Sequence, residues 1–259
     1  MADGAHRPRK RFGQHFLHDA GVIRRIVEAI APRAGEPMVE IGPGEGVLTA
    51  PLLERGVRLE AIEVDRDLAA RLRERFGRAL VVHEGDALAF DFGALPAGTR
   101  VAGNLPYNIS TPLLFHLARW SHHLGEQHFM LQREVVERMA ASHSTPEYGR
   151  LSVMLQVQYR IERLFRVGPG AFRPPPAVES AVVRLRPIPL AERPALDAAA
   201  FHALVAQAFA ARRKTLRNAL RLEAEALAAL GLDPKQRPEN LSPADYVRVS
   251  AALSRASSR

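Results

Sequence analysis

The chain has 259 residues, of which 47% are hydrophobic and 25% charged, a composition that excludes disorder for most of its length. It contains no cysteine, which excludes a disulfide scaffold, a cysteine-ligated metal and a thiol nucleophile, and which suits a reducing, cytoplasmic location. Its longest uncharged run, residues 101–118, contains two Asn, two Pro, a Gly and a His, so we expect neither a membrane span nor a secretory signal.

The net charge of +8 lies mainly at the two ends of the chain. Residues 1–19 and 191–259 together hold six of the eight excess positive charges, whereas residues 20–190 are nearly neutral. This distribution indicates a catalytic core whose extensions meet a polyanion, and nucleic acid is the commonest polyanion in a cell. The alternative is that the basic ends serve solubility alone.

The first part of the chain has the rhythm of a doubly wound α/β fold. A basic arm ending in Phe16 and Leu17 precedes a helical pattern over 22–30. Short apolar runs then alternate with amphipathic stretches, so we expect parallel strands covered by helices on both faces. The expected strands are 38–41, 59–62, 80–82, 101–103 and 129–131, and the expected helices are 47–55, 67–76, 111–119 and 133–141.

The pattern changes after Tyr148. Residues 151–159 fit either a helix or a strand, and a strand over 181–185 is expected to be the last of the sheet. Prolines at 187, 189 and 194 indicate a linker, after which apolar residues at helical spacing begin a small all-helical domain. The sequence therefore predicts an arm over 1–19, an α/β domain over 20–190 and a helical domain over 191–259.

Three polar signals follow three successive expected strands. Gly42-Pro43-Gly44 lets the backbone approach a ligand, Glu63 stands where a carboxylate accepts from ribose hydroxyls, and Asp86 is placed to accept from an adenine amine. A dinucleotide fingerprint fits poorly, because its third glycine comes one position early, at Gly46. The pattern favours an S-adenosylmethionine (SAM) site, although both acidic residues also suit capping of the next helix.

The tetrapeptide Asn104-Leu105-Pro106-Tyr107 follows the fourth expected strand. An adenine amine is a poor nucleophile because its lone pair is delocalised into the ring, so an enzyme must localise that pair with hydrogen-bond acceptors. The Asn104 side-chain oxygen and the Leu105 carbonyl suit this task, Pro106 fixes the turn, and Tyr107 offers a ring on which the base stacks. A simple strand-ending turn is the alternative interpretation.

In this context the sequence resembles a known family, the small-subunit ribosomal RNA adenine dimethyltransferases of the KsgA (RsmA) type. The resemblance extends from residue 11 to about residue 250. It implies a Rossmann-like SAM-dependent methyltransferase fold with a small helical C-terminal domain. It rests on the segments 12–17, 40–44, 63–65, 103–109, 172–176, 180–183 and 212–215.

The resemblance implies dimethylation of N6 of two adjacent adenosines in a hairpin loop near the 3′ end of 16S rRNA, during late assembly of the small subunit. It implies that Tyr107 and Phe172 sandwich the target base, with core packing as the alternative for Phe172. The family often has Asn at the position of His15. The implied cofactor-binding residues are His15, Leu17, Gly42, Gly44, Glu63, Asp86 and Asn104.

Basic residues of both extensions are candidates for RNA contact, and a monomer is expected. Arg213, Arg217 and Arg221 recur every four residues, which predicts one basic helix face with Lys214 beside it, unless that face is merely solvated. Arg9, Lys10 and Arg11 are the candidates in the arm. The histidines lack the partners of a metal site.

Two rival functions share much of this pattern. One is a methylase of large-subunit RNA, of the antibiotic-resistance type. The small-subunit type agrees better with three features, namely the 12–17 block, the tetrapeptide and the helical tail. The other is an RNA-binding assembly or transcription factor that keeps the fold without needing turnover. The intact tetrapeptide argues against binding alone.

Overall fold

The structure is a computed structural model that describes residues 15–257. Within these residues the chain forms two compact units. The first comprises residues 15–136 and 161–187, and the second comprises residues 137–160 and 188–257.

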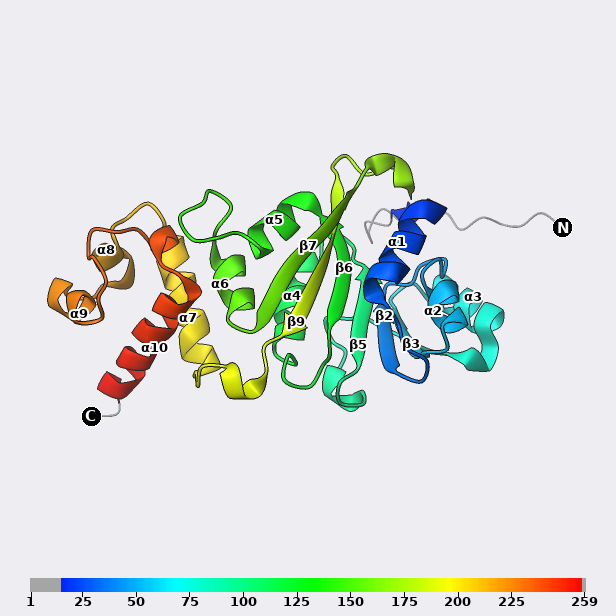
Figure 1. Ribbon diagram of the computed structural model, residues 1–259, viewed down its shortest axis with the longest axis horizontal. Helices are drawn as coiled ribbons and strands as arrows, with labels where there is room; N and C mark the ends of the chain where they lie inside the picture. The colour runs from blue at the N-terminus through cyan, green and yellow to red at the C-terminus, as the bar shows by residue number, and fades with distance from the viewer. Residues whose placement is uncertain (1–14, 258–259) are drawn as a thin grey trace. The chain divides into compact units, whose positions relative to one another are not determined.

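The first unit is built on a seven-stranded sheet in the order β4-β3-β2-β5-β6-β9-β7 (Figure 1). The pairs β2–β3, β2–β5, β3–β4 and β5–β6 are parallel, as the alternation of strands and helices predicts. The strands are β2 (Pro37–Ile41), β3 (Arg58–Glu63), β4 (Leu80–Glu84), β5 (Arg100–Asn104), β6 (Gln127–Gln132), β7 (Tyr159–Val167) and β9 (Ser180–Pro187).

The last strand of the chain runs antiparallel to its neighbour. In β9, Val183 is paired with Phe129 of β6, and the edge of the sheet on this side is β7. Residues 151–159, which fit a helix or a strand equally in the sequence, contain most of a helix and only the first residue of β7.

Helices cover both faces of this sheet. Met38, Ala102 and Met130 lie on one face and share a core cluster with Ile26 and other residues of the first helix. Their strand neighbours, which point to the opposite face, are buried as well, as a doubly wound fold requires. The helices of this unit are α1 (Ala20–Ile30), α2 (Thr49–Glu54), α3 (Arg66–Phe76), α4 (Ser110–Ala118) and the start of α5 (Arg133–Met139).

A two-stranded sheet ties the N-terminal segment to the first unit. In β1 (Phe16–Leu17), Leu17 pairs with Phe172 of β8 (Phe172–Arg173), and the strands are antiparallel. Asp19 then caps α1 by accepting a hydrogen bond from the Val22 amide at 2.9 Å. No pattern in the sequence predicts this pairing, which fixes residues 15–17 beside the site described below.

The second unit is helical in the described part of the chain, apart from the first two residues of β7. Two tyrosines anchor its loops, because Tyr148 donates to the Leu241 carbonyl at 2.9 Å and Tyr246 donates to the Pro238 carbonyl at 2.8 Å. Its helices are α6 (Arg150–Gln156), α7 (Ala198–Ala210), α8 (Leu216–Leu220), α9 (Ala224–Ala229) and α10 (Pro243–Ser257).

The division of the chain differs from the predicted domain boundaries. Residues 137–160, which the sequence places in the α/β domain, belong to the second unit. The physical reason is that α6 packs against α7 and α10, which lie far along the chain. Of the helices in the part of the chain that the structure describes, none combines the length and apolar character needed to cross a bilayer.

Candidate functional site

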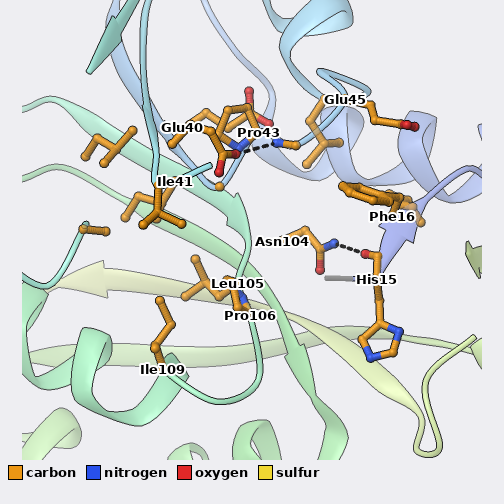
Figure 2. Close-up of a pocket in the computed structure, with 18 of the residues that line it drawn as sticks. His15, Phe16, Glu40, Ile41, Pro43, Glu45, Asn104, Leu105, Pro106 and Ile109 are labelled. Carbon is orange, nitrogen blue, oxygen red and sulfur yellow. Dashed lines mark hydrogen bonds between the residues drawn. The ribbon is translucent and has the colours of Figure 1, made fainter. Parts of the chain in front are cut away.

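A cavity of about 210 Å³ opens at the carboxyl ends of the parallel strands in the first unit (Figure 2). This edge is where open α/β sheets bind ligands, because the loops that follow the strands converge there. The cavity is lined by His15, Phe16, Leu17, Glu40, Ile41, Gly42, Pro43, Gly44, Glu45, Val47, Leu48, Ile62, Glu63, Val64, Gly85, Asp86, Ala87, Asn104, Leu105, Pro106, Tyr107, Asn108 and Ile109.

The glycine loop after β2 forms one wall. Gly42 and Gly44 have φ angles of +66° and +58°, a region that favours glycine. A Cβ atom on Gly42 would lie 3.8 Å from the backbone oxygen of Asn104, and one on Gly44 would lie 3.2 Å from the Phe16 ring. A side chain at either position would therefore narrow the cavity, which fits a site where backbone lies against a ligand.

Glu63 ends β3 with its carboxylate at the cavity wall. The side chain is 4% exposed, and it accepts hydrogen bonds from the Gly44 amide at 3.1 Å and the Asp65 amide at 2.9 Å. Burial raises the pKa of Glu63, although the backbone hydrogen bonds oppose that rise. Asp65, rather than Glu63, caps the following helix by accepting from the Asp67 amide at 3.0 Å.

Asp86 follows β4 and begins a turn, not the helix that the capping interpretation requires. Its carboxylate lies at the cavity wall and is exposed, and one oxygen accepts from the Leu88 amide at 2.9 Å, as a turn cap does. An aspartate held in this way still has acceptor capacity for a ligand, because each carboxylate oxygen has two lone pairs.

Glu40 is a site residue that the sequence pattern does not single out. It lies in β2 directly before the glycine loop, is 1% exposed, and accepts from the Thr49 hydroxyl at 2.6 Å. Burial raises its pKa to about 7, and the nearby Glu63 carboxylate adds to the rise. The available signal was an acidic residue between Val39 and Ile41 in an otherwise apolar strand.

Asn104 lies at the end of β5, the strand that pairs with β2, so its backbone lies beside the glycine loop. Its side-chain Nδ2 donates to the His15 carbonyl at 3.1 Å, as the dashed line in Figure 2 shows. This bond fixes the plane of the amide, and it turns Oδ1 toward the side of the cavity where Leu105 and Pro106 lie. The Ile109 amide closes the turn by donating to the Pro106 carbonyl at 3.2 Å.

Tyr107 is held at both ends. Its hydroxyl is 2.6 Å from the Ser180 hydroxyl, and its backbone carbonyl accepts from the Ser110 hydroxyl at 3.1 Å. Its ring lies beside the His15 imidazole, with 5.6 Å between the ring centroids and 30° between the planes. Partial burial raises the pKa of the Tyr107 phenol, so the phenol stays protonated at neutral pH.

The structure does not bring Phe172 into this site. Phe172 is 2% exposed, belongs to the hydrophobic core cluster with Leu17 and Val182, and is not among the residues that line the cavity. The sandwich of a base between Tyr107 and Phe172 stays a prediction. Pairing of β8 with β1 turns this ring inward, as the core-packing alternative has it.

The basic residues of the tail do not share one helix face. Arg213 and Lys214 lie in a turn between α7 and α8, Arg217 lies in α8, and Arg221 ends that helix with a φ of +56°. All four are exposed, and Arg217 pairs with Glu223 at 3.2 Å. The predicted continuous helix is therefore wrong. The candidates Arg9, Lys10 and Arg11 lie outside the described residues.

The chain is similar to curated proteins over nearly its whole length. The chain is 55% identical over 257 residues to ribosomal RNA small subunit methyltransferase A of Aromatoleum aromaticum, covering 98% of this chain and 97% of that protein. It is 57% identical over 251 residues to the protein of the same name from Thiobacillus denitrificans, covering 96% and 98%.

Solved structures show the same fold. A dimethyladenosine transferase from Plasmodium falciparum superimposes with a TM-score of 0.84 at 24% identity, covering 94% of this chain and 98% of that one. The 23S rRNA methyltransferase ErmE superimposes with a TM-score of 0.68 at 25% identity, covering 92% and 99%. The sequence profile of ribosomal RNA adenine dimethylases matches residues 5–255. The chain belongs to the ribosomal RNA adenine dimethylase family.

Proposed function

We propose that the chain transfers methyl groups from SAM to N6 of two adjacent adenosines in a hairpin loop near the 3′ end of 16S rRNA, late in small-subunit assembly. The observation that carries this proposal is that the predicted cofactor-binding residues and the predicted methyl-acceptor residues line one cavity. The glycine loop and Glu63 form one part of its wall, and Asn104 to Tyr107 form another. The 51–57% identity to proteins named as small-subunit methyltransferases supports the choice of RNA.

The residues at the cavity suit the cofactor. Gly42 and Gly44 leave backbone open to it, Glu63 and Asp86 offer carboxylate oxygens to ribose hydroxyls and an adenine amine, and Leu17 adds apolar surface. When bound, SAM supplies an electrophilic methyl group on a positively charged sulfur. His15 contributes its backbone carbonyl to Asn104, while its imidazole Nδ1 is 2.7 Å from the Pro174 carbonyl.

The remaining residues prepare the target amine. The Asn104 Oδ1 and the Leu105 carbonyl accept hydrogen bonds from its N–H groups, of which there are two in the first transfer and one in the second. These bonds localise the nitrogen lone pair and hold it in line with the methyl group. Pro106 fixes the turn, and Tyr107 provides the stacking surface. A neutral amide suffices here, because the amine becomes cationic on methylation and then releases its proton readily.

The partners follow from the same reaction. A paired adenine hides its amine, so an unpaired hairpin loop is the suitable substrate. The exposed basic residues Arg213, Lys214, Arg217 and Arg221 supply phosphate contacts on 16S rRNA or an immature subunit. We place the activity in the cytoplasm and assign it to a monomer.

Replacement of Asn104 by Ala tests the proposed chemistry. The hydrogen bond that Oδ1 accepts from the amine becomes stronger as the amine becomes cationic. It therefore stabilises the transition state more than the bound substrate. We expect kcat at saturating SAM and RNA to fall by about 10²-fold or more, as on loss of one preorganised electrostatic partner. RNA affinity, measured in parallel by filter binding, stays near the parent value. An Asn104→Ala variant that binds both ligands and methylates at the parent rate contradicts this role.

A further inference from the structure

Ser180 is the first residue of β9, in the interior of the first unit. It pairs with Gln132 of β6 in the antiparallel ladder, and its side chain is 0% exposed. A hydroxyl on a buried strand within a sheet has little freedom to move. Ser180 therefore offers a fixed hydrogen-bonding point beside the loop that follows β5.

That fixed point meets the phenol of Tyr107. The two hydroxyl oxygens are 2.6 Å apart, a normal distance for an O–H···O hydrogen bond. At the other end of the residue, Ser110 donates to the Tyr107 carbonyl at 3.1 Å. With the backbone held at one end and the phenol at the other, the protein sets the long axis of the ring. Because a phenol forms its hydrogen bonds mainly in the plane of its own ring, the direction of the Ser180 bond also favours one rotation about that axis.

The segment that ends in Ser180 restrains a second ring. The Pro174 carbonyl is 2.7 Å from His15 Nδ1, and the His15 ring lies 5.6 Å from that of Tyr107. Figure 2 shows the His15 ring at the cavity, on the far side of its own carbonyl from Phe16. Residues 174–180 thus orient two adjacent aromatic rings, one through a backbone carbonyl and one through the Ser180 hydroxyl.

We propose that Ser180 is a positioning residue for methyl transfer. Its hydroxyl fixes the long axis of the Tyr107 ring and favours one orientation of its plane, and that orientation sets the angle at which a stacked adenine presents N6 to the methyl group. The inference rests on the proposed function, because it concerns how that site aligns its substrate. Ser180 acts through Tyr107, since its side chain is wholly buried and does not line the cavity.

A double-mutant cycle tests the coupling. Ser180→Ala and Tyr107→Phe each remove one partner of the same hydrogen bond, so each is expected to lower kcat about two- to tenfold. The double variant is expected to be no slower than the slower single variant, because the shared bond is already absent. KM for SAM stays unchanged. Ser121→Ala, which removes another buried serine hydroxyl in the same unit, is the matched control and keeps the parent kcat.

A spectroscopic readout separates alignment from general stability. An RNA hairpin with 2-aminopurine at the target adenine is quenched when that base stacks on Tyr107. We expect Ser180→Ala and Tyr107→Phe to relieve the quenching by similar amounts, and Ser121→Ala to leave it unchanged. Tyr107→Phe keeps the test available if Ser180→Ala does not fold, because it leaves β9 intact.

Two results overturn the inference. One is a Tyr107→Phe variant whose kcat and fluorescence quenching equal those of the parent. The other is a double variant in which the decreases in kcat of the two single variants multiply. A parent protein that transfers no methyl group to RNA contradicts the proposed function instead. In that case the quenching still reports whether Ser180 orients Tyr107.

Discussion

Two backbone amides hold the Glu63 carboxylate at the cavity wall. One of them belongs to Gly44, so the glycine loop and the end of β3 are fixed relative to each other. An acceptor that is already positioned loses little conformational entropy when it binds. The arrangement predicts a large contribution of this one side chain to cofactor affinity.

We expect Glu63→Ala to weaken SAM binding by about ten- to a hundredfold. The physical reason is the loss of charge-assisted hydrogen bonds worth about 1.5–3 kcal/mol. Isothermal titration calorimetry on the folded variant measures this directly. Glu54→Ala removes an exposed carboxylate at the end of α2 and serves as the control with parent affinity. Unchanged SAM affinity in Glu63→Ala would remove this residue from the site.

Glu40 makes the stability of the fold depend on pH, with a sign opposite to that of most carboxylates. Burial raises its pKa from 4.5 to about 7, so between these values the folded state holds a proton that the unfolded state releases. The free energy of unfolding therefore falls as the pH rises through this window, by roughly 3 kcal/mol in total for this one group.

Glu40→Gln is expected to remove that slope, because an amide does not titrate and still accepts from Thr49. The measurement is chemical denaturation of parent and variant from pH 5 to pH 8. The difference between the two curves separates Glu40, with its coupling to Glu63, from Glu126 and Glu162, whose lowered pKa values act in the opposite direction. Parallel curves for parent and variant would contradict an unusual titration of Glu40.

Single residues also mark where sequence reasoning stops. Glu63 and Asn104 are predictable, because each ends an apolar run at the ligand-binding edge of the sheet. The burial of Phe172 is not, because it depends on pairing with Leu17, far away in the sequence. For the same reason no local pattern indicates that Ser180 meets Tyr107.

At the scale of elements, the five parallel strands are predictable because each contains a short apolar run. Four of them are largely buried, and only the edge strand β4 exposes a face, at Val81. The edge strand β7 is harder to recognise, since the adjacent charged residues Glu162 and Arg163 interrupt the alternation of polar and apolar residues. The antiparallel direction of β9 comes from its pairing with β6. Local hydrophobic periodicity does not indicate which strand β9 pairs with or in which direction it runs.

The basic segment 213–221 is an element whose shape differs from the prediction but whose exposure agrees with it. Because Arg213, Lys214 and Arg217 are exposed, replacing all three by Ala is expected to weaken RNA binding without changing SAM affinity. The slope of log affinity against log salt should become shallower by about 0.7 to 0.9 for each phosphate that the variant no longer neutralises. Filter binding at several salt concentrations measures that slope.

A matched variant controls for net charge alone. Replacing Arg66, Arg71 and Arg78, three exposed arginines in or just after α3, removes the same number of charges from the first unit. This control should leave the salt slope near the parent value. If the two triple variants behave alike, the basic segment is a solvated surface and its assignment to RNA is wrong.

For the molecule as a whole, charge and chemistry are divided between parts of the chain. The nearly neutral middle of the sequence contributes all but residues 15–17 of the cavity lining, and much of the excess positive charge lies in the C-terminal tail. This division suits an enzyme that holds a large polyanion by its backbone and presents one base at a time to a small site. An RNA-binding factor without turnover would need the first property but not the second.

The most direct test of the proposed function is mass spectrometry of ribosomal RNA after incubation of the purified protein with SAM. Unmethylated small subunits, immature subunits and large-subunit RNA are offered separately. We expect N6,N6-dimethyladenosine at two adjacent positions near the 3′ end of 16S rRNA and a strongly reduced yield with Asn104→Ala. Methylation confined to large-subunit RNA, or binding of small-subunit RNA without methylation of any substrate, would contradict the proposed function.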